Sequence, residues 1–113
     1  MRKLISSLAL CFIYTSAMAG NCPEAAATNI PTFCPTFDTS AQCHCVEHGL
    51  PKSACQDTMK IYKRMLVVYR TVERACASQH DTTPQTCMDD WNCYVNGGKD
   101  SQGRSCSGTG SHC

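Results

Sequence analysis

The chain has 113 residues, a formal net charge of +1 and eleven cysteines. This length fits one small domain, and so balanced a charge gives no general electrostatic attraction to nucleic acid or to an anionic membrane. The cysteine content is far above that of an average globular protein and is typical of a disulfide scaffold.

The N-terminal segment, residues 1–19, has the pattern of a secretory signal. Arg2 and Lys3 precede a mostly apolar run of about eleven residues, and Ala19 ends a small-residue cleavage pattern. Because a membrane-spanning helix needs about 20 apolar residues, this run is too short to be an anchor. We therefore expect cleavage after Ala19, and a periplasmic or extracellular protein of residues 20–113 with no transmembrane segment.

Ten cysteines lie beyond this signal, since only Cys11 belongs to it. An even number of cysteines in a short exported chain predicts up to five disulfides, each of which stabilises a small fold by about 2–4 kcal/mol. Such bridges compensate for the small core that a domain of this size can bury. The predicted disulfide cysteines are Cys22, Cys34, Cys43, Cys45, Cys55, Cys76, Cys87, Cys93, Cys106 and Cys113.

Residues 20–51 contain most of the prolines of the chain. Proline interrupts helices and central strands, and here it recurs at short intervals. We therefore expect an irregular N-terminal segment of turns, short helical pieces and extended linkers, without a long regular element.

The run CHCVEH, residues 43–48, has the residue types of a zinc or copper site. Thiolate ligands must stay reduced, whereas an exported chain meets an oxidising environment. The Cys43-His44-Cys45 spacing also differs from the Cys-X2-Cys pairs of structural zinc sites. We therefore assign the cysteines to disulfides and predict neither a metal nor another cofactor, although His44 and His48 could bind a metal without the thiols.

Residues 52–78 have the periodicity of one long helix. Lys52 or Ser53 offers an N-cap, and apolar side chains recur at steps of three and four residues. Such a stripe lies on one face of a helix and predicts that this face packs against a core. The stripe consists of Cys55, Met59, Tyr62, Leu66, Tyr69, Val72 and Cys76.

A second helix is predicted for residues 84–96. Thr83 suits the N-cap and Pro84 suits the first helical position, while Asn96 and the glycines after it form a stop signal. The apolar stripe of this helix consists of Cys87, Trp91 and Tyr94, with Met88 and Val95 beside it.

The link between these two helices is short enough to make them antiparallel neighbours. Cys76, near the end of the first helix, and Cys87, near the start of the second, would then meet, which predicts a Cys76–Cys87 disulfide. Cys93 lies about 9 Å further along the second helix, where the facing turn of the first helix has no cysteine. We therefore expect Cys93 to pair with the N-terminal segment or with the tail.

The tail, residues 98–113, is rich in glycine and serine and has no apolar periodicity. This composition is typical of a flexible segment. Cys106 and Cys113 indicate instead that disulfides fasten the tail to the rest of the chain.

The predicted fold class is therefore mainly α. We expect a small disulfide-rich domain built on an antiparallel helical hairpin (about 52–78 and 84–96), with an irregular N-terminal segment and a cysteine-containing Gly/Ser-rich tail. Residues 20–113 would form a single disulfide-stapled domain in which the hairpin covers residues 52–97.

The run CASQHD, residues 76–81, resembles part of the active-site motif of secreted phospholipase A2, in which a Cys-Cys-X-X-His-Asp run on a helix supplies the histidine that activates water. The similarity covers Cys76, His80 and Asp81, whereas Ala77 stands at the second cysteine and the glycine-rich calcium loop has no counterpart. The resemblance implies a calcium-dependent hydrolase that uses His80 and Asp81. A solvent-exposed histidine at the negative end of a helix is the simpler interpretation.

Five basic side chains of residues 52–78 project within a sector of about 120°, nearly opposite the apolar stripe. This basic ridge suits an anionic lipid, a lipopolysaccharide or an acidic protein surface, although a solvated outer face has the same pattern. The aromatic side chains that a single-stranded nucleic acid needs lie on the other face, so nucleic acid is not an expected partner. The basic ridge consists of Lys60, Lys63, Arg64, Arg70 and Arg74.

We therefore predict an exported, non-catalytic binding protein whose partner is another protein or an anionic component of the cell envelope. It would serve as an accessory part of an envelope or secretion assembly, or as a secreted effector. The alternatives are a small phospholipase A2-like hydrolase using His80 and a lipid carrier with a cavity between its helices. A core filled by Trp91, Tyr62, Leu66 and Tyr69 would leave no such cavity.

Overall fold

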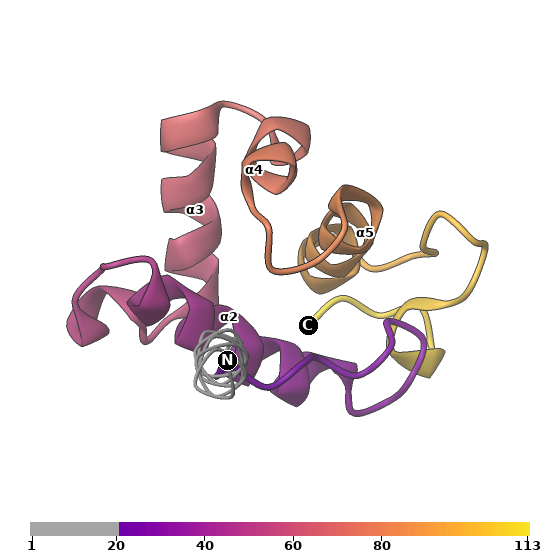
Figure 1. The fold of residues 1–113 in the computed structure, drawn as a ribbon. Helices are drawn as coiled ribbons and strands as arrows, with labels where there is room; N and C mark the ends of the chain where they lie inside the picture. The colour runs from indigo at the N-terminus through magenta and orange to yellow at the C-terminus, as the bar shows by residue number, and fades with distance from the viewer. Residues whose placement is uncertain (1–20) are drawn as a thin grey trace, which may run out of the picture.

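The computed structural model describes residues 21–113, which fold into a mainly helical structure with five disulfides (Figure 1). The predicted signal peptide, residues 1–19, lies outside the described residues. None of the helices in this described part is long and apolar enough to cross a lipid bilayer. The elements are α2 (Phe33–Glu47), a 3-10 turn (Lys52–Cys55), α3 (Thr58–Tyr69), α4 (Val72–Ser78), α5 (Pro84–Val95) and a second 3-10 turn (Cys106–Gly108).

Helix α2 occupies part of the segment 20–51, which we predicted to be irregular, so that prediction is wrong. Pro31 precedes the helix, and Pro35 lies in its first turn, where a missing N–H removes no intrahelical hydrogen bond. Phe33 and Phe37, one turn apart, are both buried, with ring centroids 5.4 Å apart. The prolines are therefore compatible with a helix of 15 residues, which is stabilised by its buried aromatic face.

The long helix predicted for residues 52–78 is divided into three pieces. Asp57 caps α3, because its carboxylate accepts hydrogen bonds from two backbone amides of the first turn. Arg70 then has a positive φ of 77°, which ends the α-helix, and the Thr71 hydroxyl caps α4. The N-cap predicted at residues 52–53 is wrong, because a separate 3-10 turn occupies that position.

This division changes which side chains of α3 are buried. Met65 is buried, and Ile61 and Tyr62 are partly buried against the core. Met59 and Tyr69, which we predicted to face the core, are 36% and 37% exposed. The predicted apolar stripe is wrong at these positions because it followed one continuous helix through both flanking cysteines.

Aromatic side chains from three helices form the centre of the core. The ring of Phe37 on α2 meets Trp91 on α5 edge-on, with centroids 4.8 Å apart, and Tyr94 lies 5.2 Å from Phe37. Tyr62 of α3 packs against Trp91 at 5.4 Å. Aromatic pairs at such distances contribute about 0.5–1.5 kcal/mol beyond the area they bury, so this cluster stabilises the arrangement of α2, α3 and α5.

A polar network beside these rings joins the same three helices. Asp38 of α2 accepts hydrogen bonds from the Tyr94 hydroxyl of α5 and from the Thr58 hydroxyl of α3, both at 2.6 Å. Burial, followed by the hydrogen bond to Asp38, raises the pKa of Tyr94 to about 12. No motif in the sequence indicated this network, because its members lie far apart along the chain.

Helix α5 and its disulfides agree with the prediction. The Thr83 hydroxyl caps the helix, and the Cys76–Cys87 bridge is confirmed. Cys93 pairs with the tail, which is one of its two predicted destinations. Helix α4, rather than α3, makes the main contact with α5. The five disulfides are Cys22–Cys43, Cys34–Cys113, Cys45–Cys55, Cys76–Cys87 and Cys93–Cys106.

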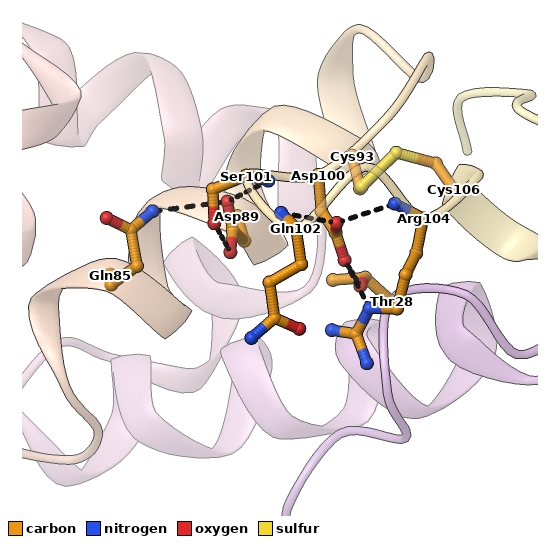
Figure 2. Close-up of polar contacts among 9 residues, drawn as sticks. All are labelled: Thr28, Gln85, Asp89, Cys93, Asp100, Ser101, Gln102, Arg104 and Cys106. Carbon is orange, nitrogen blue, oxygen red and sulfur yellow. Dashed lines mark hydrogen bonds and ion pairs between the residues drawn. A yellow bond between two sulfur atoms is a disulfide. The ribbon is translucent and has the colours of Figure 1, made fainter.

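The chain after α5 forms a loop around Asp100, whose side chain is fully buried (Figure 2). The carboxylate accepts four hydrogen bonds of 2.8–3.0 Å: one from the Thr28 hydroxyl, one from the Gln102 amide, and two from the amide and the side chain of Arg104. Burial alone would raise the pKa of Asp100, but the four hydrogen bonds together have the larger effect and lower it to about 2. We call residues 99–106 the Asp100 loop.

Asp89 fastens this loop to α5. Its carboxylate accepts hydrogen bonds from the Ser101 amide at 3.0 Å and the Ser101 hydroxyl at 2.7 Å, and from the Gln85 side chain at 3.3 Å (Figure 2). The Cys93–Cys106 disulfide adds a covalent link between the same two segments. The glycine-rich sequence is therefore held against α5 by hydrogen bonds and a disulfide.

Candidate ligand-binding cavity

A cavity of about 620 Å³ lies between α2, α3 and α5. Helix α2 crosses below the other two, α3 rises from one of its ends, and α5 lies on the opposite side (Figure 1). Phe37, Met65 and Trp91 contribute one apolar wall residue from each helix. Small-molecule sites in proteins typically have about 300–1,000 Å³ and mainly apolar walls, so this cavity can admit a small organic molecule.

Trp91 and Tyr69 line this space instead of filling it, whereas Tyr62 is not among its lining residues. We predicted that a core filled by Trp91, Tyr62, Leu66 and Tyr69 would leave no void, and this is wrong. Trp91 packs edge-on against Phe37 and at a tilt against Tyr62. Tyr69 lies at the exposed end of α3. Because α3 ends at the break after Tyr69 and α4 takes the contact with α5, the space between α3 and α5 stays open.

Asp90 is the most perturbed acidic group on the cavity wall. Burial, and to a lesser extent the neighbouring charge of Asp89, raises the pKa of Asp90 to about 7. Within residues 21–113, no hydrogen bond or ion pair joins the Asp90 carboxyl to another side chain or to the backbone. A carboxyl group that is partly buried without a donor from the protein is costly to ionise, and it is available to a ligand.

A second acidic group, Asp81, lies at the rim of the cavity between two histidines. Its carboxylate oxygens are 3.5 Å from His44 Nδ1 and 3.2 Å from His48 Nε2. Glu47 Oε1 lies 3.7 Å from His44 Nδ1. This nitrogen atom is buried and forms no hydrogen bond among the described residues. Protonated histidines would therefore form ion pairs with Asp81 and join the end of α2 to the segment before α5.

The two residues of the phospholipase-like run point to different surroundings. Asp81 lines the cavity, whereas His80 is exposed and is not among the residues that line it. The imidazoles next to Asp81 belong to His44 and His48 of the α2 end. The structure therefore does not bring His80 and Asp81 together at the cavity.

The cysteines of the CHCVEH run are joined in disulfides. Cys43 pairs with Cys22, and Cys45 pairs with Cys55. The one described group of three residues close enough to share a metal ion is Cys22, Cys43 and Glu47, and its two sulfurs already form a bond with each other. Thiolate ligation at this run would therefore require reduction of the Cys22–Cys43 bridge.

The basic ridge is interrupted by the break between α3 and α4. All five of its side chains are exposed, but a common helix axis relates only Lys60, Lys63 and Arg64. Arg64 also lines the cavity. Beside it, Val67 and Val68 are 77% and 63% exposed, a feature that the predicted stripe did not include.

Sequence reasoning singled out His44, His48 and Asp81 but did not place them together. It did not single out Asp90, and nothing in the neighbours of Asp90 along the chain distinguishes it from Asp89. The signal that marks Asp90 is three-dimensional, because Asp90 lines a cavity together with residues of α2 and α3, and burial raises its pKa.

Comparison with known proteins finds no matching family model, no similar curated protein and no similar solved structure. Five disulfides fit a small exported protein of the extracellular type. Any more specific function must be inferred from the cavity and the surface of the molecule.

Proposed function

We propose that this protein is an exported, non-catalytic binding protein that takes a small ligand into the cavity between α2, α3 and α5. The observation that carries this proposal is the cavity itself, because its volume and its aromatic walls suit an apolar body. The ligand's polar part would meet the few charged groups on the wall and rim. Export as residues 20–113 agrees with the five disulfides.

Two features favour binding over the hydrolase alternative. His80 is exposed and lies outside the cavity lining, so the residue that the phospholipase-like run would use does not face the cavity. Asp81, its neighbour, lies against His44 and His48. A phospholipase-like mechanism would need the histidine and the aspartate at one substrate site.

The charged lining also argues against simple lipid carriage. Glu24, Asp81 and Asp90 all line the cavity. An acyl chain in contact with these carboxyl groups would remove their water without offering a hydrogen bond, which is unfavourable. A ligand that combines an apolar body with a polar group fits the walls better. Within the cell envelope, such a protein would act as an accessory part of an assembly or as a secreted effector.

The test of this proposal is binding of the neutral fluorescent probe N-phenyl-1-naphthylamine to the oxidised protein of residues 20–113. We expect the emission of the probe to rise on binding and a competing ligand to reverse the rise. Ala41→Phe, which places a ring in the cavity, should weaken binding about fivefold or more, since the added side chain occupies the ligand's space.

Ala77→Phe is the matched control, because Ala77 is exposed on α4 and does not line the cavity. It should leave the affinity for the probe unchanged. Intact disulfides and an unchanged circular dichroism spectrum would show that both variants are folded. Failure of the wild-type protein to bind, or equal losses in the two variants, would overturn the proposal.

A second candidate function is docking on an anionic membrane surface. The exposed Val67 and Val68 lie next to the basic Lys63, Arg64 and Arg70, and apolar side chains flanked by cations suit the interface of such a membrane. Sedimentation with phosphatidylcholine vesicles, with and without phosphatidylglycerol, tests it. Binding only to the anionic vesicles, lost in V67S/V68S, is the expected result, and equal binding to both kinds of vesicle would contradict it.

A further inference from the structure

The cavity wall holds one carboxyl group that the protein itself leaves without a partner. Asp90 is partly buried on the cavity wall, to which α2, α3 and the turn before α5 also contribute, yet no hydrogen bond or ion pair among residues 21–113 reaches its carboxyl group. Its neighbours in the chain differ in this respect, since Asp89 accepts three hydrogen bonds. An ionised carboxylate in such a position is stabilised when a cation comes within contact distance.

The other charged groups of the cavity do not supply that cation. The imidazoles of His44 and His48 lie against Asp81, and no ion pair joins Arg64 to Asp90. The side chain of Arg64 is exposed at the rim. Apart from Asp90, the titratable and charged residues that line the cavity are Glu24, His44, His48, Arg64, Tyr69 and Asp81.

The apolar part of the wall defines the rest of the ligand. Trp91 and Phe37 lie edge to face, and Trp91 is adjacent to Asp90 on α5. Aromatic rings bind apolar groups by area, and they attract cations through the negative face of the ring. A cationic head beside Asp90 and an apolar body along these rings would therefore use both features of the wall.

We infer that the cavity binds a small organic amine, with its ammonium group paired to the Asp90 carboxylate and its apolar body against Trp91 and Phe37. This inference rests on the proposed function and adds to it the chemical class of the ligand. It names a binding group, Asp90, which the sequence did not distinguish from the exposed carboxylates.

The ionisation of Asp90 makes this binding depend on pH. Burial raises the pKa of Asp90 to about 7, so the carboxyl group is largely neutral below that pH and cannot pair with an ammonium ion. The affinity should therefore rise by up to about tenfold per pH unit below pH 7 and level off above pH 8. Binding at pH 6 should release about 0.4 proton or more, since a tenfold preference for the ionised carboxylate lowers its pKa by about one unit.

The experiment compares 4-phenylbutylamine, 4-phenylbutanol and 4-phenylbutyrate as competitors for the naphthylamine probe. The three share one apolar body and differ in the charge of the head. We expect the amine to compete at least about tenfold more strongly than the alcohol, and the acid to compete most weakly, because a partly desolvated ion pair contributes at least this much.

Asp90→Asn should lower the affinity for the amine about tenfold and leave that for the alcohol unchanged. Asp89→Asn is the matched control, because it removes the same charge one residue away, from a side chain that does not line the cavity. It should keep most of the preference for the amine. Calorimetry of the wild-type protein in two buffers at pH 6 measures the released proton without any variant.

The possible results separate the two proposals. If the probe binds but the alcohol competes as well as the amine, or if Asp90→Asn leaves the preference unchanged, the amine inference is wrong and the cavity still binds ligands. The same conclusion follows if the amine binds without releasing a proton. If neither the probe nor the amine binds the wild-type protein, the proposed function itself is wrong.

Discussion

The Asp100 loop and the cavity around Asp90 place the same residue type in opposite surroundings. Asp100 is buried and accepts four hydrogen bonds, which hold its pKa at about 2. Asp90 is partly buried but has no donor among the described residues, and its pKa is raised to about 7. Burial acts in the same direction on both groups, so the hydrogen bonds account for the difference.

This difference separates a structural carboxylate from a candidate binding group. The Asp100 carboxylate needs no ligand, because the protein supplies four hydrogen bonds to it from the Asp100 loop and from Thr28. The Asp90 carboxyl group on the cavity wall accepts no hydrogen bond from the described residues, and a ligand cation would supply the missing partner. An unpartnered polar group on an apolar wall is therefore a better indication of a binding site than the number of charged residues nearby.

The largest effect is expected from Asp100→Ala. The change leaves two partly buried backbone amides and the buried Thr28 hydroxyl without an acceptor, which should lower the free energy of unfolding by about 3 kcal/mol. Urea unfolding at pH 7 with intact disulfides measures it. Asp57→Ala, which removes an exposed helix cap, is the control and should cost about 1 kcal/mol. A loss for Asp100→Ala no larger than this control would contradict the account.

Asp100 and Asp90 should also respond to pH with opposite signs. The lowered pKa of Asp100 stabilises the fold above the unfolded value of about 3.9, and this contribution is lost as the pH falls through 2. The raised pKa of Asp90 gives a contribution that is complete below pH 4 and is lost as the pH rises through 7.

Asp90→Asn should therefore stabilise the protein in one pH range only. At pH 8 the variant avoids the cost of a partly buried carboxylate, so its free energy of unfolding should exceed that of wild type by about 1–2 kcal/mol, less than the full pKa shift because solvent still reaches the group. At pH 4 the two proteins should be equally stable, since Asp90 is then neutral. Urea unfolding at both pH values measures the difference, and an equal gain at pH 4 and pH 8 would show that the charge of Asp90 is not its cause.

The smallest loss of stability is expected from Tyr94→Phe. This change removes one of the two hydrogen bonds that the Asp38 carboxylate accepts from Tyr94 and Thr58. Loss of one donor still leaves Asp38 a hydrogen bond. The expected loss is about 1 kcal/mol in the free energy of unfolding. Tyr69→Phe, at a partly exposed ring, should change stability by less than about 0.5 kcal/mol. Equal effects of the two changes would argue against the Asp38 network.

The elements that could be predicted from the sequence are those with local signals. Helix α5 has a cap at Thr83 and a proline in its first turn, and a short link brings Cys76 to Cys87. Helix α2 was missed because its prolines were treated as breakers, although Pro35 lies where a helix tolerates proline. The break at Arg70 was missed because a positive φ usually indicates glycine.

The cavity could not be predicted, because it follows from how separate helices pack. A continuous helix over residues 52–78 would have placed α3 against α5, whereas the break at Arg70 and Thr71 gives that contact to α4. The opposite surroundings of Asp90 and Asp100 likewise depend on residues distant in the chain, such as Thr28. Local sequence therefore predicts the helices better than it predicts the binding group.

The most direct test of the account is a carbon-13 NMR titration of the aspartate carboxyl groups, with and without 4-phenylbutylamine. We predict a midpoint near pH 7 for Asp90 in the free protein, lowered by the amine, and a midpoint near pH 2 for Asp100 that the amine does not change. Midpoints near the ordinary value of about 3.9 for both residues would contradict the account. An Asp90 midpoint that the amine leaves at pH 7 would contradict its role in binding.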